Sequence, residues 1–414
     1  MCDKILDQYH VAHGFRIISM ISCLCVVIFL AAGTAGPIVA ESILSTPSST
    51  FTVTKLADTD DGVCDADCSL REALGATESN GFIVFDSNLA GTIRLKSTLE
   101  ISRNVTIDGP VAEGITISGN KKVRVFYVNS GVHFTIRNLT IADGFVKGIE
   151  GSESHRGGAA EGGGMYNNEG VVTIINSTFR KNIVKGGSGV LAGSGGAGLG
   201  GAIASVGTVF LVNSTFSANK AIGGKGALGI RWGRYFNTSI ISGGGAGGGA
   251  YGGAIAVRGT LSINNCTFVD NSASGGGGGG GHRPSRSGAS KGGAIYVPRG
   301  VLSPSIKNTL IANSSSGGNC NRVFGSRGYN IDSDGTCGLS AAGDQSNVDP
   351  KLALLKNNGG STLTHALLPG SPAINGGNPA GCTDSKGVAI STDQRGLNRS
   401  QGGRCDIGAY EFAQ

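Results

Sequence analysis

Gly200-Gly201-Ala202-Ile203 leads to Asn213-Ser214-Thr215-Phe216 and then to Asn219. Nearly the same unit returns at Gly252-Gly253-Ala254-Ile255, and further copies begin around Gly163 and Gly292. A unit of this size that repeats is typical of a solenoid, because each coil buries its apolar face only against its neighbours. The repeat therefore predicts stacked coils rather than a globular layered domain.

The spacing within the unit also predicts which side chains fill the core. Residues at equal offsets in two copies occupy equivalent places in successive coils. In the fourth copy the spacing places Leu310 where the earlier copies have Phe. We expect four side chains to point inward and to stack on their counterparts one coil later: Ile203, Val209, Leu211 and Phe216 on Ile255, Leu261, Ile263 and Phe268.

The composition agrees with an all-β solenoid. Gly makes up 73 of the 414 residues, without the strict three-residue period of collagen. Ile, Val and Phe recur at regular places, which excludes disorder of the whole chain. Short apolar or alternating segments follow one another from Gly81, and turn residues such as Asp108-Gly109 separate them. We expect four parts: a leader over 1–40, a cap over 51–80, a parallel β-helix over 81–345 and C-terminal coils with a cap module over 346–414.

A short helix is predicted before the first coils. Ser69 and Glu72 have the spacing of a capping box, in which each side chain bonds the backbone of the other residue. A helix at this place would close the open end of the apolar core and protect the edge strands.

The first 40 residues have the pattern of a signal peptide. Arg16 precedes the apolar stretch 17–32, and Ile38-Val39-Ala40 is a suitable cleavage site. An uncleaved anchor is the alternative. We favour cleavage because the most apolar part is shorter than the roughly 20 residues that a membrane span needs.

Seven cysteines lie outside this leader, and they favour an oxidising compartment. Cys266 takes the Ser position of the repeat, so we expect a packed, unpaired thiol. The other six form three pairs that are local in sequence, as a solenoid requires. A zinc site is less well supported, since the spacing of zinc ligands is missing. The predicted disulfides are Cys64–Cys68, Cys320–Cys337 and Cys382–Cys405.

Long Gly-rich stretches separate the later repeats, at 186–200, 223–249 and 275–292. We expect them to leave one edge of the solenoid and to be disordered, because seven consecutive Gly occupy 275–281. They also carry cations and aromatic rings, which bind uronates and stack on sugars. A mobile, solvated loop is the simpler interpretation of these residues. The candidate ligand-binding residues are Lys225, Arg231, Trp232, Arg234, Tyr235, His282, Arg283 and Arg286.

An acidic loop precedes the predicted helix. Oxygen-rich loops bind Ca²⁺, but EF-hand spacing fails here because Gly62 comes one position early. A solvated loop tied by Cys64 and Cys68 is the favoured alternative, so Ca²⁺ is the one cofactor to test. The candidate metal ligands are Asp58, Asp60, Asp61, Asp65 and Asp67.

Asn recurs at two places in the unit. A stacked ladder of side-chain amides is the structural interpretation, and Asn-x-Ser/Thr glycosylation at Asn176, Asn213 and Asn265 is the alternative. We favour the ladder because the motif follows the repeat. The recurring residues are Asn138, Asn176, Asn213, Asn265 and Asn308 at one place, and Asn182, Asn219, Asn271 and Asn313 at the other.

No catalytic constellation is evident in the sequence. Glycosidases need paired carboxylates at a suitable separation. The carboxylates of the repeats, Asp143, Glu161, Glu169 and Asp270, do not recur at one position of the unit.

Three motifs carry a resemblance to known families. Cys68-Ser69-Leu70-Arg71-Glu72-Ala73 resembles the signature that opens exported right-handed parallel β-helix proteins of bacteria. The units at 201–203 and 216–219 resemble repeats of polymorphic outer-membrane protein passenger domains. The segments 393–396 and 405–411 resemble a C-terminal module that often precedes varied surface anchors. The resemblance implies a right-handed, single-stranded, pectate-lyase-like β-helix on the cell surface or secreted. It implies no activity, because this fold hosts both enzymes and adhesins.

The last motif also suggests an ion pair. Arg395 and Arg399 lie shortly before Asp406 and Glu411. We expect at least one Arg to pair with one of these carboxylates and to fasten the last segment over the open end of the solenoid, because an Arg fork matches a carboxylate.

The function expected from the sequence is that of a secreted or cell-surface binding or structural protein, adhesin-like, with an acidic glycan as ligand. The outer membrane is one such surface. The net charge of +6 suits acidic partners and is too dispersed for nucleic acid. Membrane attachment is expected only through an uncleaved leader. The alternative function is a polysaccharide lyase or glycoside hydrolase acting on acidic polysaccharide.

Overall fold

The computed structural model describes residues 49–112, 114–153, 155–229, 243–281, 284–384, 386–399 and 402–413. The chain divides into two compact units, Met1–Thr46 and Pro47–Gln414. All described residues belong to the second unit, so the predicted leader over 1–40 lies outside them.

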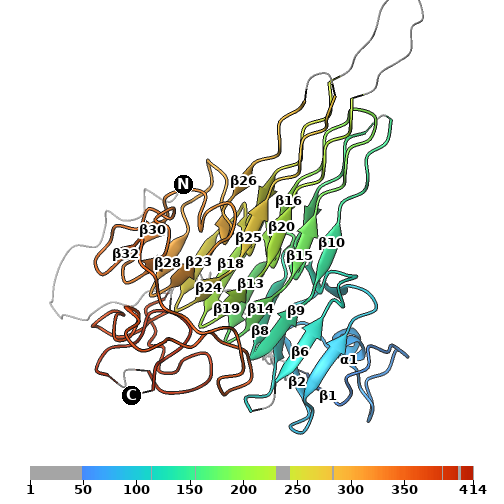
Figure 1. Cartoon of the computed structure of the whole chain (residues 1–414). Helices are drawn as coiled ribbons and strands as arrows, with labels where there is room; N and C mark the ends of the chain where they lie inside the picture. Colours follow the sequence, from blue (N-terminus) through green and yellow to red (C-terminus); the bar gives the residue numbers. More distant parts are fainter. Residues whose placement is uncertain are drawn as a thin grey trace, which may run out of the picture. The chain divides into compact units, whose positions relative to one another are not determined.

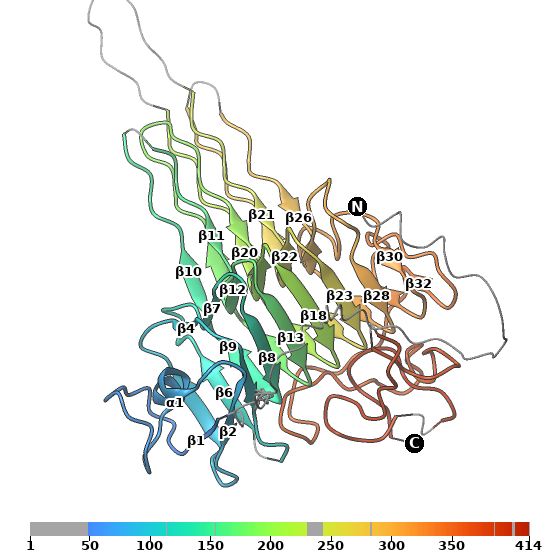
Figure 2. The ribbon, with the colours of Figure 1, turned by 180° about the vertical axis from the view of Figure 1, so that it is seen from behind.

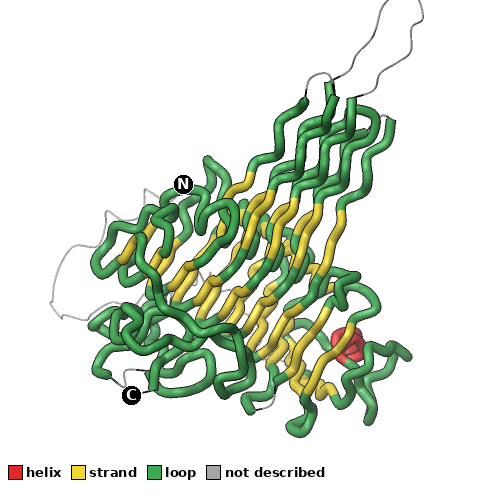
Figure 3. The backbone as a smooth tube through the Cα atoms, in the orientation of Figure 1, coloured by secondary structure: helices red, strands yellow, loops and turns green. Residues whose placement is uncertain are grey.

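The second unit is nearly all β, and each described pairing between named strands is parallel (Figures 1 and 3). In four central coils, the chain passes in turn through sheets that we name C, A, B, D and E, and then enters sheet C again one coil further. The coils before them use only sheets A, B and C. Neighbouring strands of a sheet come from successive coils, as expected for a parallel β-solenoid.

Three sheets surround the main core. Sheet A contains β1 (Thr50–Val53), β2 (Gly81–Phe85), β5 (Val105–Asp108), β8 (His133–Arg137), β13 (Val171–Ile175), β18 (Thr208–Val212), β23 (Leu261–Asn264), β28 (Ser305–Lys307) and β30 (Gly325–Ser326). Sheet B contains β3 (Gly91–Arg94), β6 (Ile115–Ser118), β9 (Leu139–Ala142), β14 (Thr178–Arg180), β19 (Thr215–Ser217), β24 (Thr267–Val269), β29 (Leu310–Ala312), β31 (Ile331–Asp332) and β32 (Gln345–Ser346). Sheet C contains β4 (Leu99–Ile101), β7 (Phe126–Val128), β12 (Met165–Asn167), β17 (Ile203–Ser205), β22 (Ile255–Val257) and β27 (Ile295–Tyr296).

Two smaller sheets extend from the four central coils. Sheet D contains β10 (Phe145–Lys147), β15 (Ile183–Lys185), β20 (Lys220–Ile222) and β25 (Ser272–Ser274). Sheet E contains β11 (Ala160–Glu161), β16 (Gly198–Leu199), β21 (Ala250–Tyr251) and β26 (Ser290–Lys291).

The predicted core stacking is confirmed. Ile203 pairs with Ile255, and Val209 and Leu211 pair with Leu261 and Ile263. All of these side chains are buried, and so are Phe216 and Phe268, whose rings stack with centroids 4.7 Å apart.

The register of the fourth copy differs from the prediction. Phe268 pairs with Ile311, and Leu310 pairs with Thr267, so Leu310 faces outward. The longer turn before β28 is absorbed before the corner, because Ile306 pairs with Ile263 and Asn308 takes the same corner as Asn265. Ile311 is therefore the counterpart of Phe268, and apolar residues on both faces of β29 hid this alignment in the sequence.

The two recurring Asn positions have different structural roles. Asn138, Asn176, Asn213, Asn265 and Asn308 lie at the corner between sheets A and B, with φ between 46° and 55°. Asn tolerates this left-handed conformation better than most residues, so the corner explains the recurrence. Asn213 and Asn265 are buried, which leaves no room for a glycan on either of them, whereas Asn176 is half-buried.

The second position forms the predicted amide ladder. The Nδ2 of Asn182 donates to the Oδ1 of Asn219, and that of Asn219 to the Oδ1 of Asn271, both at 3.0 Å. All three are fully buried. Asn313 does not join the ladder, because it corresponds to the corner residue Asp270 and is exposed, with φ 58° like Asp270.

The short N-terminal helix predicted from the capping box is confirmed. Helix α1 (Leu70–Ala76) begins with a complete capping box between Ser69 and Glu72. Leu70 and Ala73 are buried in the main core. The three predicted disulfides are present, with Cα–Cα distances of 4.5, 4.8 and 6.1 Å, and Cys266 is a buried free thiol.

The described Gly-rich stretches are ordered, contrary to expectation. Between sheets D and E, each of four coils sends out one extended segment and returns along another (Figure 2). Successive outgoing segments bond at every third residue: the N–H groups of Gly223, Gly226 and Gly229 donate to the carbonyls of Ser274, Gly277 and Gly280 at 2.8–2.9 Å. A three-residue period is that of a polyproline II helix, which has no internal hydrogen bonds. We call this two-layered extension the glycine arm; its described parts are 148–153, 155–159, 186–197, 223–229, 243–249, 275–281 and 284–289.

Hydrogen bonds also join the two layers of the glycine arm. Gly224 donates to Gly196, Gly248 to Gly224, and Gly276 to Gly248. A Cβ on Gly224 would overlap the carbonyl of Gly187. The close approach of these backbones is therefore possible only with Gly, and composition alone misled the prediction of disorder.

The C-terminal segment (the described residues of 347–413) lies along the outer face of sheet B, not over the open end as predicted (Figure 1). Gln394 bonds Thr215 and Thr178 on neighbouring strands, and the imidazole of His365 lies 3.0 Å from the hydroxyl of Ser217. The outward Thr and Ser side chains of sheet B thus obtain polar partners. The predicted ion pair is present between Arg399 and Glu411, whereas Arg395 pairs with Asp393.

Candidate functional site

The outward side chains of sheet C form one continuous row. Along each strand the side chains alternate between core and surface, so the residue after each buried Leu, Phe, Met or Ile faces outward. Strand pairing brings these residues into register: Glu100, Tyr127, Tyr166, Ala204, Ala256 and Tyr296.

A second row runs beside the first, on sheet E. It consists of Glu161, Leu199, Tyr251 and Lys291, again in register. A Gly with φ between 59° and 66° turns the chain from each strand of sheet E towards the next strand of sheet C. This turn brings the two rows together along the direction in which the coils stack.

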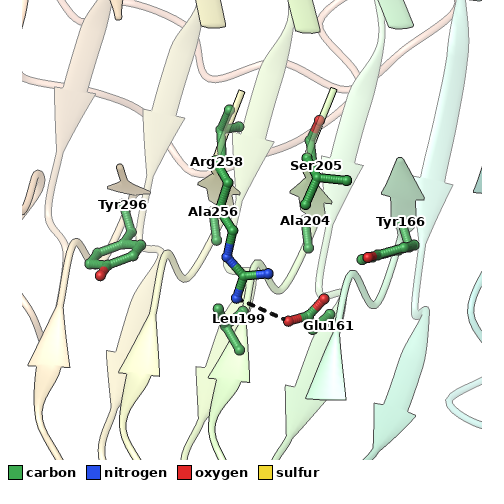
Figure 4. Close-up of a pocket in the computed structure, with 10 residues that line it drawn as sticks. Glu161, Tyr166, Leu199, Ala204, Ser205, Ala256, Arg258 and Tyr296 are labelled. Atoms are coloured by element: carbon green, nitrogen blue, oxygen red, sulfur yellow. Dashed lines mark hydrogen bonds and ion pairs between the residues drawn. The ribbon is translucent and has the colours of Figure 1, made fainter. Parts of the chain in front are cut away.

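A cleft lies where the two rows meet, and we call it the tyrosine groove (Figure 4). Its floor is formed by Ala204 and Ala256, which are small and buried. Tyr166 and Tyr296 stand at its two ends, three strands apart, which is roughly 14 Å at the usual strand spacing. The lining residues are Glu161, Tyr166, Leu199, Ala204, Ser205, Val206, Ala256, Val257, Arg258 and Tyr296.

The aromatic rings extend beyond the groove on both sides. The ring of Tyr251 lies 4.8 Å from that of Tyr296, and the ring of Tyr127 lies 5.5 Å from that of Tyr166. Burial is the main reason why the pKa of Tyr166 and of Tyr296 is raised. Both rings therefore stay neutral phenols at physiological pH.

One ion pair crosses the groove. Arg258, which follows β22, reaches over Ala256 to Glu161, with Nη2 and Oε1 3.3 Å apart (Figure 4). The Arg258 side chain is 49% exposed, so a ligand can reach it and the pair contributes little to stability. Arg124 lies against Tyr127 and Tyr166, with its guanidinium 5.7 and 5.5 Å from the ring centroids.

The shape of the groove suits a chain that lies across the surface. Its enclosed volume is about 10 Å³, whereas pockets for small molecules measure hundreds of Å³. Its lining includes one carboxylate, Glu161, which is engaged by Arg258. Hydrolysis of a glycosidic bond generally requires two.

The structure places two of the predicted ligand-binding residues. Lys225 and Arg286 are exposed on the glycine arm, Lys225 in an outgoing segment and Arg286 in a returning one. They belong to different layers of the arm. The other six candidates, Arg231, Trp232, Arg234, Tyr235, His282 and Arg283, lie outside the described residues.

Two of the five candidate carboxylates in the acidic loop are held by cations. Both oxygens of Asp58 bond Arg71, at 2.9 and 3.0 Å, and Asp67 pairs with Lys55. Asp60, Asp61 and Asp65 are not buried. Within the described ranges, no three His, Cys, Asp or Glu side chains are grouped so that they could hold a metal ion.

Sequence reasoning missed most of the groove. Asp143, Glu169 and Asp270 have φ between 51° and 60°, so their role is to form turns. Glu161 likewise does not recur at one position of the repeat, yet it lines the groove. The overlooked signal was the residue that follows the inward Met or Ile in each copy of the repeat. The first and fourth copies have Tyr166 and Tyr296 at this position, and the two copies between them have Ala.

The chain matches no protein-family model, and no curated protein sequence matches it. The three disulfides are typical of an oxidising compartment. In the part of the chain that the structure describes, no helix is long and apolar enough to cross a membrane.

Proposed function

We propose that this protein is an extracellular binding protein, built as a right-handed parallel β-helix, that holds an acidic polysaccharide in the tyrosine groove. The observation that carries the proposal is the register of Tyr166, Ala204, Ala256 and Tyr296, with Arg258 above the alanine floor. The right hand is the one that crossovers between parallel strands take in nearly all proteins.

The chemistry of the groove supports a polymeric, anionic ligand. Tyr rings present flat apolar faces and a polar hydroxyl, and such amphipathic rings are enriched at binding surfaces. Positive charge along the two rows comes from Arg258, Lys291 and Arg124. Negative charge comes from Glu161 and Glu100. A uronate carboxylate would replace Glu161 as the partner of Arg258. Binding of this kind requires no metal or cofactor.

The location follows from three further observations. The disulfides, the signal-peptide pattern over 1–40 and the resemblance of the terminal motifs to exported β-helix proteins all favour secretion or display on the cell surface. Binding is favoured over hydrolysis because the one carboxylate that lines the groove is paired with Arg258.

A binding assay with two variants tests this function. Polygalacturonate should bind the full chain more tightly than its fully methyl-esterified form, which lacks the charge. Tyr166→Ala should weaken the binding of both polymers about tenfold. Arg258→Gln should remove only the preference for the charged polymer. Phe82→Ala is the matched control, because Phe82 is an exposed aromatic on sheet A. Equal binding by all four proteins, or release of unsaturated or reducing ends from the polymer, would contradict the proposal.

A further inference from the structure

A second cavity lies on another face of the solenoid, between sheet A and the C-terminal segment. We call it the basic pocket; its volume is about 300 Å³, within the range of small-molecule sites. Its lining residues are Asn264, Lys307, Arg327, Asn378, Thr383, Asp384 and Gly387.

Two cations stand side by side in this pocket. Ile306 of β28 pairs with Ser326 of β30, so Lys307 and Arg327 follow at equivalent places on neighbouring chain segments. The backbone N–H of Arg327 donates to the carbonyl of Ile306 at 2.8 Å, which fixes this register. Like charges at facing positions of a sheet are destabilising. A fold that keeps them together gains from an anion between them.

The protein supplies little of the counter-charge itself. The Oδ1 of Asp384 accepts the N–H groups of Lys386 and Val388 at 2.8 and 2.9 Å, and it thereby closes its own turn. The Nζ of Lys307 donates to the hydroxyl of Thr383 at 2.7 Å. Among the ion pairs of the described residues, none includes Lys307 or Arg327.

We propose that the basic pocket binds a small oxyanion group, a carboxylate, sulfate or phosphate, between Lys307 and Arg327. The guanidinium of Arg327 provides the fork that recognises such oxygens in pairs, and Lys307 provides a point charge beside it. The side chains of Thr383 and Asn378 line the same cavity and supply polar groups. This site is separate from the tyrosine groove and does not depend on its function.

Two sources of the anion remain to be distinguished, a free inorganic ion and an acidic sugar. Calorimetric titration of the full chain with sodium sulfate, sodium phosphate and sodium galacturonate, at constant ionic strength set with NaCl, separates them. Saturable binding of at least one probe is expected. Binding of galacturonate alone assigns the site to an acidic sugar, and binding of sulfate or phosphate alone assigns it to an inorganic anion.

Three variants make the test specific. Arg327→Gln and Lys307→Gln should each weaken binding about tenfold or more, because a charged hydrogen-bonding partner is lost. Arg137→Gln is the matched control: Arg137 belongs to the same outward row of sheet A, four strands from Lys307, and should leave binding unchanged. Absence of saturable binding in the unmodified protein would overturn the proposal even if a variant fails to fold. Equal affinity in Arg327→Gln and Arg137→Gln would overturn it as well.

Discussion

The Nη1 of Arg399 lies 3.4 Å from the Oε2 of Glu411, and both side chains are 1% exposed. The same guanidinium donates to the Oδ1 of Asn213 at 2.8 Å and to the carbonyl of Gly408 at 2.9 Å. Burial lowers the pKa of Arg399, while Glu411 and Asp393 oppose this shift. One buried cation therefore joins the C-terminal segment to itself and to the corner beside sheet B.

Arg399→Met should release the C-terminal segment from sheet B. Removing one partner of a buried ion pair costs about 3–5 kcal/mol, because the other charge stays buried without compensation. Limited proteolysis should then cut within 347–413 in the variant but not in the unmodified protein. Arg94→Met, at an exposed position, is the control. Equal protease resistance of the two variants would show that other contacts hold the segment.

Asp406 should make stability depend on pH. Burial is the main reason why its pKa is raised from 3.8 to about 6, although the N–H groups of Phe412 and Asn375 bond the carboxyl and oppose the shift. The folded protein thus holds a proton that the unfolded chain releases at lower pH. The stabilisation from this proton is complete below pH 3.8, and it is lost as the pH rises through 6.

Asp406→Asn removes this titration. Between pH 4 and pH 7, the unfolding free energy of the unmodified protein should fall by about 2 kcal/mol relative to the variant. Urea unfolding at a series of pH values measures the difference. Parallel pH profiles for the two proteins would rule out the raised pKa.

Gly224→Ala should disrupt the glycine arm, because a Cβ there overlaps the carbonyl of Gly187. Overpacking of this kind costs about 1–3 kcal/mol. Hydrogen exchange of the amides in 186–198 and 243–249 should accelerate, whereas the strands of sheets A and B should keep their protection. Gly277→Ala is the matched control, since a Cβ at Gly277 meets no atom within 4 Å. If the amides of the glycine arm exchange at the same rate in Gly224→Ala as in the unmodified protein, the arm is disordered, as the sequence predicted.

The features that the sequence predicted are those that repeat or are local. The stacking of Phe216 on Phe268 followed from equal offsets in two copies, and the bond between Cys320 and Cys337 followed from their nearness in the chain. The contact between Thr215 and Gln394 joins residues far apart in the sequence, and Gln394 lies outside the repeats. No periodicity marks such a contact, so the position of the C-terminal segment could not be predicted.

The tyrosine groove and the glycine arm were missed for a different reason. Tyr166 and Tyr296 become neighbours of one cleft only when the register of all coils between them is known. In the glycine arm, the bonds that order Gly224 come from other coils, whereas its composition is that of a flexible chain. Both features are properties of the stack rather than of a single unit.

Asn219→Ala tests whether the amide ladder holds the coils together. The Oδ1 of Asn219 accepts the N–H and the Nδ2–H of Asn182 at 3.1 and 3.0 Å, and its Nδ2 donates to the carbonyl of Phe179 at 2.9 Å. Alanine leaves these buried groups without partners, at a cost of roughly 1–3 kcal/mol for each. The midpoint of urea unfolding should therefore fall clearly, and the exposed Asn88→Ala should leave it unchanged. If both variants unfold at the same urea concentration, the ladder follows from the stacking of the apolar core and does not contribute to it.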